Sequence, residues 1–503
     1  MRLLIVLSII FAHGACDIAD YYAKRAKLAE AENLLTVGGN YPLDHKETIV
    51  NRCLMQHKYR ELDYAFDNPQ YFNCSHHFFV YKNKMRESKV YKIIKNMPKG
   101  AALHVHDMAL LGPDYVMNLT YMDNLYFCFK PDPVLSGNHL FLQFANQLPN
   151  KTCDTWQLIS DARRDAKNVT EFDFNLRKHF TLVVDDPDTA YPAITDTWDA
   201  FMNYFTTIIP LVTYRPVWEQ YFYDALKKYR EDNLMYIEVR SVLPNLYELD
   251  GSTYDQIVTA KSYKKVLSRF IKDYPDFEGA KIIFAPSRYV GNAELDAYIE
   301  TARSLKNQVP EIFAGFDLVG QEDKGKPLID FVPKLLQAND LNFFFHAGET
   351  DWYGTQTDGN LYDAILLGTK RIGHAYALTK HPLLMKEVVE KDIGLEINLI
   401  SNSVLSLVKD LRNHPLNTYV ANGMPVVLSS DDPGAWEAEP ASDDFYVAFV
   451  GASSRLSDLS LLKALGENSL KYSALEPTRK AAALRKLNFQ WKRFIDNFDC
   501  SKY

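Results

Sequence analysis

Histidine and aspartate residues of this 503-residue chain stand at the ends of short apolar runs, in types and spacings that suit a metal site. His104 and His106 are two residues apart, so on a strand their side chains share one face. His346 ends an aromatic run, and Asp431 follows another apolar run. Three imidazoles and one carboxylate suit Zn²⁺, which in catalytic sites keeps a position for water. We therefore expect one zinc ion per chain, held by these four residues.

Two further groups suited to proton transfer remain beside this predicted ligand set. Glu349 follows His346 across a glycine turn, and His374 ends the next apolar run. Together with a metal-activated water, they indicate attack on an electrophilic carbon. A pair of partly exposed strand histidines or a closed structural zinc site is the alternative, but neither needs the additional glutamate and histidine. The run 316–322 contains no lysine that could bridge two ions after carboxylation, so we expect a single metal.

Eight apolar, β-branched runs must position these side chains. They cover 101–106, 234–242, 280–285, 312–319, 341–346, 370–374, 394–399 and 425–429, and longer helical stretches separate them. Strands that are apolar on both faces and alternate with helices predict an α/β fold, the (β/α)8 TIM barrel, with a doubly wound open sheet as the alternative. In a barrel the carboxyl ends of all strands meet at one mouth, where the predicted ligands would converge.

Two additions to the barrel are expected. Residues 16–99 have a helical pattern without β alternation and predict an N-terminal helical extension, and the barrel itself would occupy 100–503. The stretch between the first two strands is far longer than the others, so it must hold an insertion, placed at about 125–181. The formal net charge of −8, without a basic run, makes nucleic acid or an anionic membrane an unexpected partner.

The N-terminus predicts export. Residues 1–15 combine a positive charge, an apolar core and small residues in the order of a secretory signal peptide, and a buried N-terminal strand is the alternative. That apolar core is too short to span a bilayer, and no later stretch is long and uncharged enough, so no membrane insertion is expected. Glycosylation sequons begin at Asn73, Asn118, Asn150 and Asn168. Among six cysteines we expect Cys128 to pair with Cys153, and the pairing of the others stays open.

The motifs, taken together, resemble those of the adenosine deaminases. They are Met97-Pro98-Lys99-Gly100 before His-Val-His-Asp at 104–107, Gly-Phe-Asp-Leu-Val-Gly at 315–320, His-Ala-Gly-Glu-Thr at 346–350, Arg-Ile-Gly-His at 371–374 and Ser-Ser-Asp-Asp-Pro at 429–433. The predicted signal peptide, helical extension and cysteine-bearing insertion narrow the resemblance to the secreted adenosine deaminase growth factor group, the type 2 adenosine deaminases, within the metal-dependent amidohydrolase barrels.

This resemblance implies a role for each motif residue. It assigns His104, His106, His346 and Asp431 as zinc ligands, Glu349 as the acid that protonates purine N1, His374 as the group that orients and deprotonates the attacking water, Asp432 as the partner of N7, and the Gly320 backbone N–H as the partner of N3. Protonated N1 makes C6 electrophilic, so hydroxide can add there and ammonia can leave.

The ribose end of the predicted site is defined less completely. By resemblance Asp107 faces the ribose 5′ end, where its charge would repel a 5′-phosphate and favour the nucleoside over AMP. Trp198 matches an aromatic residue that covers the substrate, with core packing as the alternative. Met202 and Ser287 stand near positions where acidic or imidazole groups would be expected.

The function implied by the resemblance is extracellular deamination of adenosine and 2′-deoxyadenosine to their inosine products and ammonia, with growth-factor activity through depletion of adenosine. The N-terminal helices would pair two subunits, and the insertion would contact a cell-surface receptor or glycan. Two alternatives stay open: a growth-factor-like binding protein whose barrel is incidental, and a metal-dependent hydrolase of another heterocycle or of an ester.

Overall fold

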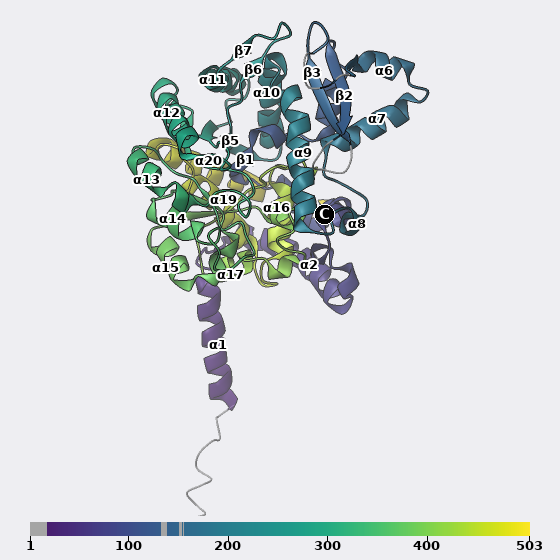
Figure 1. The fold of residues 1–503 in the computed structure, drawn as a ribbon. Coiled ribbons are helices and arrows are strands. Elements are labelled where there is room, and N and C mark those ends of the chain that lie inside the picture. The colour runs from purple at the N-terminus through teal and green to yellow at the C-terminus, as the bar shows by residue number, and fades with distance from the viewer. Residues whose placement is uncertain (1–17, 132–137, 150–152, 154) are drawn as a thin grey trace, which may run out of the picture.

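The computed structural model describes residues 18–131, 138–149, 153 and 155–503 (Figure 1). The predicted signal peptide, Cys16 and the sequon at Asn150 lie outside the described residues.

Eight parallel strands form the centre of the fold. One sheet has the order β1 (Gly100–His106), β5 (Leu234–Ser241), β8 (Gly279–Phe284) and β9 (Phe313–Phe316), and the other has the order β10 (His346–Ala347), β11 (Arg371–His374), β12 (Gly394–Ile397) and β13 (Val426–Leu428). Parallel bridges between Phe316 and Phe343 and between Val105 and Asp431 join the two sheets at both edges. The strands therefore close into a barrel, which confirms the predicted fold. Seven predicted runs cover the observed strands to within one residue, whereas the run 341–346 overlaps β10 only at His346.

Helices follow most of the barrel strands. They are α10 (Arg215–Glu231), α11 (Gln256–Asp273), α12 (Asn292–Gln308), α13 (Val332–Leu335), α14 (Asn360–Leu366), α15 (Pro382–Glu390), α16 (Leu399–Val404), α17 (Leu416–Ala421), α18 (Ser442–Tyr446), α19 (Leu459–Lys471) and α20 (Pro477–Asp496). α11 illustrates why they form: the Asp255 side chain caps the helix by accepting from the Val258 N–H, and Tyr263, Val266 and Phe270 recur at helical spacing on the buried face.

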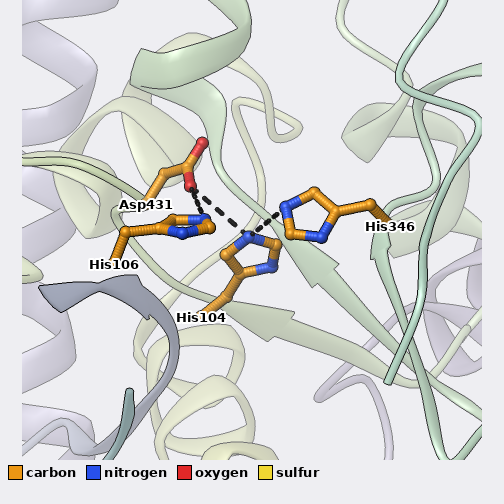
Figure 2. Close-up of side chains that lie close together, drawn as sticks. All are labelled: His104, His106, His346 and Asp431. Carbon is orange, nitrogen blue, oxygen red and sulfur yellow. Dashed lines mark hydrogen bonds and ion pairs between the residues drawn. The ribbon is translucent and has the colours of Figure 1, made fainter. Parts of the chain in front are cut away.

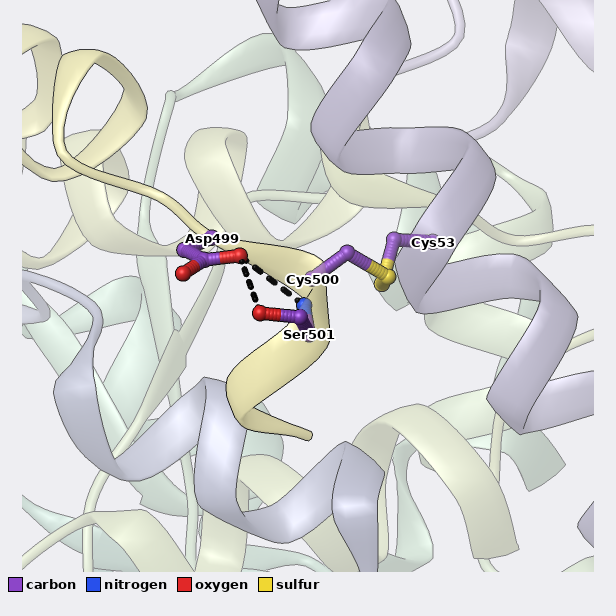
Figure 3. The surroundings of a disulfide bond; sticks show 4 residues. All are labelled: Cys53, Asp499, Cys500 and Ser501. Carbon is purple, nitrogen blue, oxygen red and sulfur yellow. Dashed lines mark hydrogen bonds between the residues drawn. A yellow bond between two sulfur atoms is a disulfide. The ribbon is translucent and has the colours of Figure 1, made fainter.

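Four helices precede the barrel, as the sequence predicts: α1 (Ile18–Leu35), α2 (His45–Asp67), α3 (Phe78–Glu87) and α4 (Lys89–Asn96). α1 buries none of its residues and projects from the rest of the molecule (Figure 1). α2 packs beside the C-terminal segment, and a disulfide joins Cys53 of α2 to Cys500 (Figure 3). The Asp499 carboxylate accepts from the Ser501 N–H and hydroxyl, which fixes the short turn that carries Cys500. Cys74 is buried and unpaired.

The long stretch after β1 contains α5 (Pro113–Leu119), α8 (Pro187–Ala190), α9 (Ile194–Val212) and the predicted insertion. Within the insertion β2 (Leu125–Pro131) pairs antiparallel with β3 (Asn138–Phe144) and β4 (Gln157–Leu158), and α6 (Ile159–Asp165) and α7 (Val169–Arg177) follow. Cys128 of β2 and Cys153 form a disulfide. A short hairpin of β6 (Leu246–Tyr247) and β7 (Thr253–Tyr254) follows β5. No described helix combines the length and apolar character needed to cross a membrane.

Candidate active site

The four predicted metal ligands converge at the carboxyl ends of the barrel strands (Figure 2). One ligand atom from each of His104, His106, His346 and Asp431 lies within 4.8 Å of the others. His104 Nε2 is 3.0 Å from His346 Nε2, and the Asp431 Oδ1 is 3.0 Å from His106 Nε2 and 3.4 Å from His104 Nε2. The backbone holds Asp431 in place, because its N–H donates to the His104 carbonyl while its own carbonyl accepts from the His106 N–H.

The hydrogen-bond partners of the histidines show that this set fits a cation. His104 Nδ1 lies 2.7 Å from Glu396 Oε2, and His346 Nδ1 lies 2.6 Å from Asp317 Oδ2. A carboxylate only accepts, so each Nδ1 carries the hydrogen and each neutral ring turns its Nε2 lone pair toward the cluster. Two lone pairs and the Asp431 carboxylate would then repel one another unless a positive ion lies among them. Carboxylates in these outer positions are typical of histidine metal ligands.

Two buried arginines balance the carboxylates behind the histidines. Arg240 donates to Asp317 Oδ2 at 2.8 Å and to Glu396 Oε2 at 2.7 Å, and Arg371 donates to Glu396 Oε1 at 2.5 Å. Burial alone would raise the pKa of Glu396, but Arg240 and Arg371 hold it well below its ordinary value. Arg371 also pairs with Glu238 at 2.6 Å. These groups keep both carboxylates ionised and therefore fix the ring orientation of His104 and His346.

Glu349 lies beside the ligand cluster in a form that can donate a proton. Its side chain is buried, its Oε1 is 3.6 Å from His374 Nδ1, and no described residue hydrogen-bonds to that oxygen. Burial, followed by the negative charges of Asp431 and Glu322, raises the pKa of Glu349 well above its ordinary value. A carboxyl group that stays protonated near neutral pH is suited to act as a general acid.

His374 is buried next to Glu349 and Asp431, and burial lowers its pKa well below the ordinary value. The Leu416 N–H donates to His414 Nδ1, so His414 carries its hydrogen on Nε2 and donates to Asn402 Oδ1 at 3.0 Å. This leaves the Asn402 amide group to donate to His374 Nδ1 at 3.1 Å. His374 therefore carries its hydrogen on Nε2, which lies 3.6 Å from Asp431 Oδ2.

A cavity of about 220 Å³ opens beside these groups and is lined by Asp107, Trp198, Gly320 and Asp432, the four predicted substrate contacts. Asp432 Oδ1 is buried and accepts no hydrogen bond from a described residue, so it is free for a ligand. Gly320 has a φ of +108°, and a Cβ there would come within 2.6 Å of the Tyr289 ring. Only glycine suits that conformation and that close approach.

The residues predicted to lie near the ribose also line this cavity. Burial raises the pKa of Asp107 to about 6 although Tyr263 donates to it at 3.0 Å, so the carboxylate stays largely ionised at neutral pH. Trp198 is buried against the Phe201 ring, with 5.6 Å between ring centroids, and it also lines the cavity. The core-packing and substrate-covering interpretations of Trp198 both agree with this position. Met202 and Ser287 line the same cavity.

Several residues of the site are absent from the sequence prediction: Arg240, Asp317, Glu396, Ser401, which donates to Asp431 Oδ2 at 2.7 Å, and Asn402. The sequence could have indicated Glu396, because it is the one charged residue in the otherwise apolar run of residues 394–397. Arg240 gives the same signal in β5. A charge inside a predicted barrel strand has to be paired, so it indicates a buried partner.

Comparison with known proteins identifies the family. A family model described as adenosine deaminase matches residues 172–489, and one described as adenosine/AMP deaminase N-terminal matches residues 5–94. An adenosine deaminase of Lutzomyia longipalpis is 44% identical over 487 residues, covering 95% of this chain and 94% of that protein. Adenosine deaminase 2 of Homo sapiens is 39% identical over 500 residues, covering 98% of this chain and 96% of that protein.

Solved structures with the same fold are more distant in sequence. An Arabidopsis N6-mAMP deaminase superposes with a TM-score of 0.56 at 16% identity, covering 80% of this chain and 99% of that chain. An amidohydrolase from Burkhoderia ambifaria with bound Zn superposes with a TM-score of 0.52 at 16% identity, covering 82% and 95%. At this identity the likeness concerns the fold alone.

Proposed function

The chain belongs to the adenosine deaminase family, and on that premise we propose that this hydrolytic deaminase is a secreted zinc enzyme that converts adenosine and 2′-deoxyadenosine to inosine and 2′-deoxyinosine. The observation that carries the proposal is the buried Glu349, whose pKa its surroundings raise, beside a cluster of three histidines and one aspartate at the mouth of the barrel. The reaction consumes one water and releases one ammonia.

The roles of the ligand cluster follow from its donor set. His104, His106, His346 and Asp431 would hold one zinc ion, whose charge, when bound, lowers the pKa of a water to about 7. Asp317 and Glu396 keep the His346 and His104 rings in the orientation that presents Nε2. The cluster thereby prepares a nucleophile next to the substrate cavity.

Glu349 acts on the purine ring. Its proton passes to N1, which withdraws electron density from C6 and makes that carbon open to attack by the water oxygen. Asp432, also kept protonated because burial and then Asp431 raise its pKa, can donate to N7, and the Gly320 N–H can donate to N3. These contacts distinguish a purine from an ester or another heterocycle.

His374 orients the water. With its hydrogen on Nε2, the neutral ring donates toward the water oxygen and directs a lone pair to C6. To take up the water proton, Nε2 must present a lone pair, so the ring hydrogen would have to move to Nδ1 and the Asn402 amide would have to turn its oxygen toward that atom. The ionised Asp107 would repel a 5′-phosphate, which favours nucleosides over nucleotides.

The remaining parts of the proposal concern the surroundings of the enzyme. Residues 1–15 would be removed on export, and two disulfides, Cys53–Cys500 and Cys128–Cys153, suit an oxidising compartment. The 16–99 extension would pair two subunits, supported by the exposed apolar side chains of α1: Ile18, Tyr21, Tyr22, Leu28 and Leu35. The insertion at about 125–181, within the 100–503 barrel domain, would bind a cell-surface receptor or glycan.

The test uses Glu349→Gln, which keeps the size of the side chain and removes the acid. We expect zinc content to stay unchanged while adenosine turnover falls by at least about 100-fold, the lower end of the contribution of a general acid. Inosine formation, measured by chromatography together with metal content, decides the result. Turnover of Glu349→Gln at the wild-type rate would show that Glu349 is not the general acid.

The same variant separates the enzyme from a growth-factor-like binding protein. If growth-factor activity works through depletion of adenosine, Glu349→Gln abolishes the cellular response together with turnover. A response that survives in the inactive variant would assign it to binding by another surface of the chain.

A further inference from the structure

A second cavity lies at the opposite end of the barrel from the ligand cluster. Its volume is about 630 Å³, and its lining residues include Lys281, Phe313 and Arg371, which stand at or near the first residues of β8, β9 and β11. The segment between α19 and α20, residues 472–476, closes the other side. Because the metal ligands stand at the last residues of the strands, this cavity and the candidate active site are separated by the barrel interior.

Positive charge exceeds negative charge in the wall of this cavity. Its six cationic residues are Lys281, Lys306, Lys370, Arg371, Lys471 and Lys480, and its three acidic residues are Asp340, Asp392 and Glu476. The net charge of the lining side chains is therefore positive in a protein whose overall charge is −8.

Half of the cations are already balanced. Lys306 donates a hydrogen bond to the backbone carbonyl of Asp340 and lies 3.8 Å from its carboxylate, and Lys471 donates to the Asp392 carboxylate at 3.1 Å. Arg371 is paired with Glu238 and Glu396 in the barrel interior.

The other three cations lack such partners. Lys281 is only 8% exposed, yet its single ion-pair partner is Glu476, 3.8 Å away and 73% exposed at its side chain. No described residue accepts a hydrogen bond from the side chain of Lys370 or Lys480. Burial lowers the pKa of Lys480, and the charges of Arg371 and Lys471 lower it further against the opposing Glu238 carboxylate. A nearly buried ammonium group without a close acceptor is costly unless a ligand supplies the acceptor.

We propose that this cavity binds a polyvalent oxyanion of the phosphate type, held by Lys281, Lys370 and Lys480. A phosphate group offers several acceptor oxygens and at least one full negative charge, which matches three ammonium groups that face the same space. The cavity is larger than one phosphate and falls in the range of small-molecule sites. The apolar rings of Phe313 and Phe344 in its wall offer contacts for the carbon skeleton of a molecule that carries the phosphate.

The experiment measures anion binding to the purified full chain by titration calorimetry at constant ionic strength. Inorganic phosphate and glucose 1,6-bisphosphate are the two probes, which distinguish a free anion from a phosphate carried on a larger molecule. We expect saturable binding of at least one probe at one site per chain. Lys370→Gln and Lys480→Gln should each weaken that binding about tenfold, the loss expected for one charged hydrogen bond.

The choice of variants keeps the result decisive. Lys370 is exposed, so its replacement carries little folding risk, whereas Arg371 is left intact because it supports Glu396. Lys409→Gln removes the same charge from a side chain that is 90% exposed and does not line the cavity, so its binding should equal that of the wild type. If neither probe binds saturably at concentrations up to about 10 mM, which exceeds a weak dissociation constant of about 1 mM, the proposal is overturned. Binding that Lys370→Gln and Lys480→Gln leave unchanged, as for an anion held at the metal cluster, would overturn it equally.

Discussion

Replacement of Asp317 by asparagine tests the outer carboxylates of the candidate metal site. Asp317 Oδ1 accepts from the Leu318 N–H at 2.7 Å and from the His346 N–H at 2.9 Å, while Oδ2 faces His346 Nδ1. In Asp317→Asn the two backbone donors hold the amide oxygen in the Oδ1 position, so the amide NH₂ must face Nδ1. His346 Nδ1 then becomes an acceptor, and the ring hydrogen moves to Nε2, the atom that should bind the metal.

The expected loss follows from this change of tautomer. Removal of an outer partner of a metal-binding histidine typically costs 10- to 100-fold in metal affinity, which corresponds to about 1.4–2.8 kcal/mol. Arg240 also loses one acceptor, but it keeps Glu396 at 2.7 Å and two backbone carbonyls, of Leu103 and Phe344. We therefore expect weakened zinc binding in a chain that still folds.

The assay titrates zinc into the metal-free chain against a competing chelator and records thermal unfolding of the same samples. Asp358→Asn is the matched control, because the buried Asp358 carboxylate pairs with His381 Nε2 at 2.9 Å and belongs to no described metal-type cluster. Excess zinc should restore part of the deaminase activity of Asp317→Asn. If this variant binds zinc as tightly as the wild type and as Asp358→Asn, the argument from the histidine tautomer is refuted.

Three further predictions concern stability and substrate binding. Replacement of Cys53 and Cys500 by serine removes a disulfide that spans 447 residues, for which the chain-entropy model gives a stabilisation of at most about 6 kcal/mol. Chemical denaturation should show that the unfolding free energy falls by several kcal/mol, while turnover is retained. Burial lowers the pKa of Lys58 to about 7. Between pH 7 and the ordinary lysine pKa near 10, the unfolded chain therefore binds more protons than the folded chain, and the unfolding free energy rises with pH. Denaturation curves of Lys58→Met at several pH values should show a smaller rise. Trp198→Ala should raise KM for adenosine about tenfold, as expected for the loss of roughly 1–2 kcal/mol of aromatic contact, whereas Trp198→Phe should retain most of the affinity.

The barrel could be predicted because its strands are buried on both faces and therefore appear as nearly continuous apolar runs. The insertion was harder to predict because its sheet is antiparallel and only partly covered. In β3, Leu140, Leu142 and Phe144 are buried and alternate with residues that are less buried, a period-two pattern that the sequence displays within a stretch that is predominantly helical elsewhere. The partner strand β2 was harder to predict, because Leu125, Phe127 and the disulfide-bonded Cys128 are buried whereas Phe129 is exposed, which breaks the period-two pattern.

The ligands of the metal cluster could be predicted from the sequence, whereas the residues that hydrogen-bond to those ligands could not. Each proposed ligand follows an apolar strand, and closure of a barrel brings all strand ends together whatever the exact register. The pairing of Glu396 with His104, from strands separated by β13, and of Asp317 with His346, from neighbouring strands, depends on which residues point inward at the same height. That information lies in the strand register and tilt, which apolar patterning does not specify.

The charged residues behind the metal-ligand cluster provide an independent argument for the valence of the ion that the four ligands would hold. Arg240 and Arg371 contribute two positive charges, while the four carboxylates of Glu238, Asp317, Glu396 and Asp431 contribute four negative ones. Together these six side chains carry a net charge of −2. A divalent cation neutralises it, whereas a monovalent ion leaves an uncompensated buried charge, which is costly. Metal binding and the stability of the barrel mouth should therefore be coupled, because the ion that supplies the chemistry also completes the charge balance of the barrel interior.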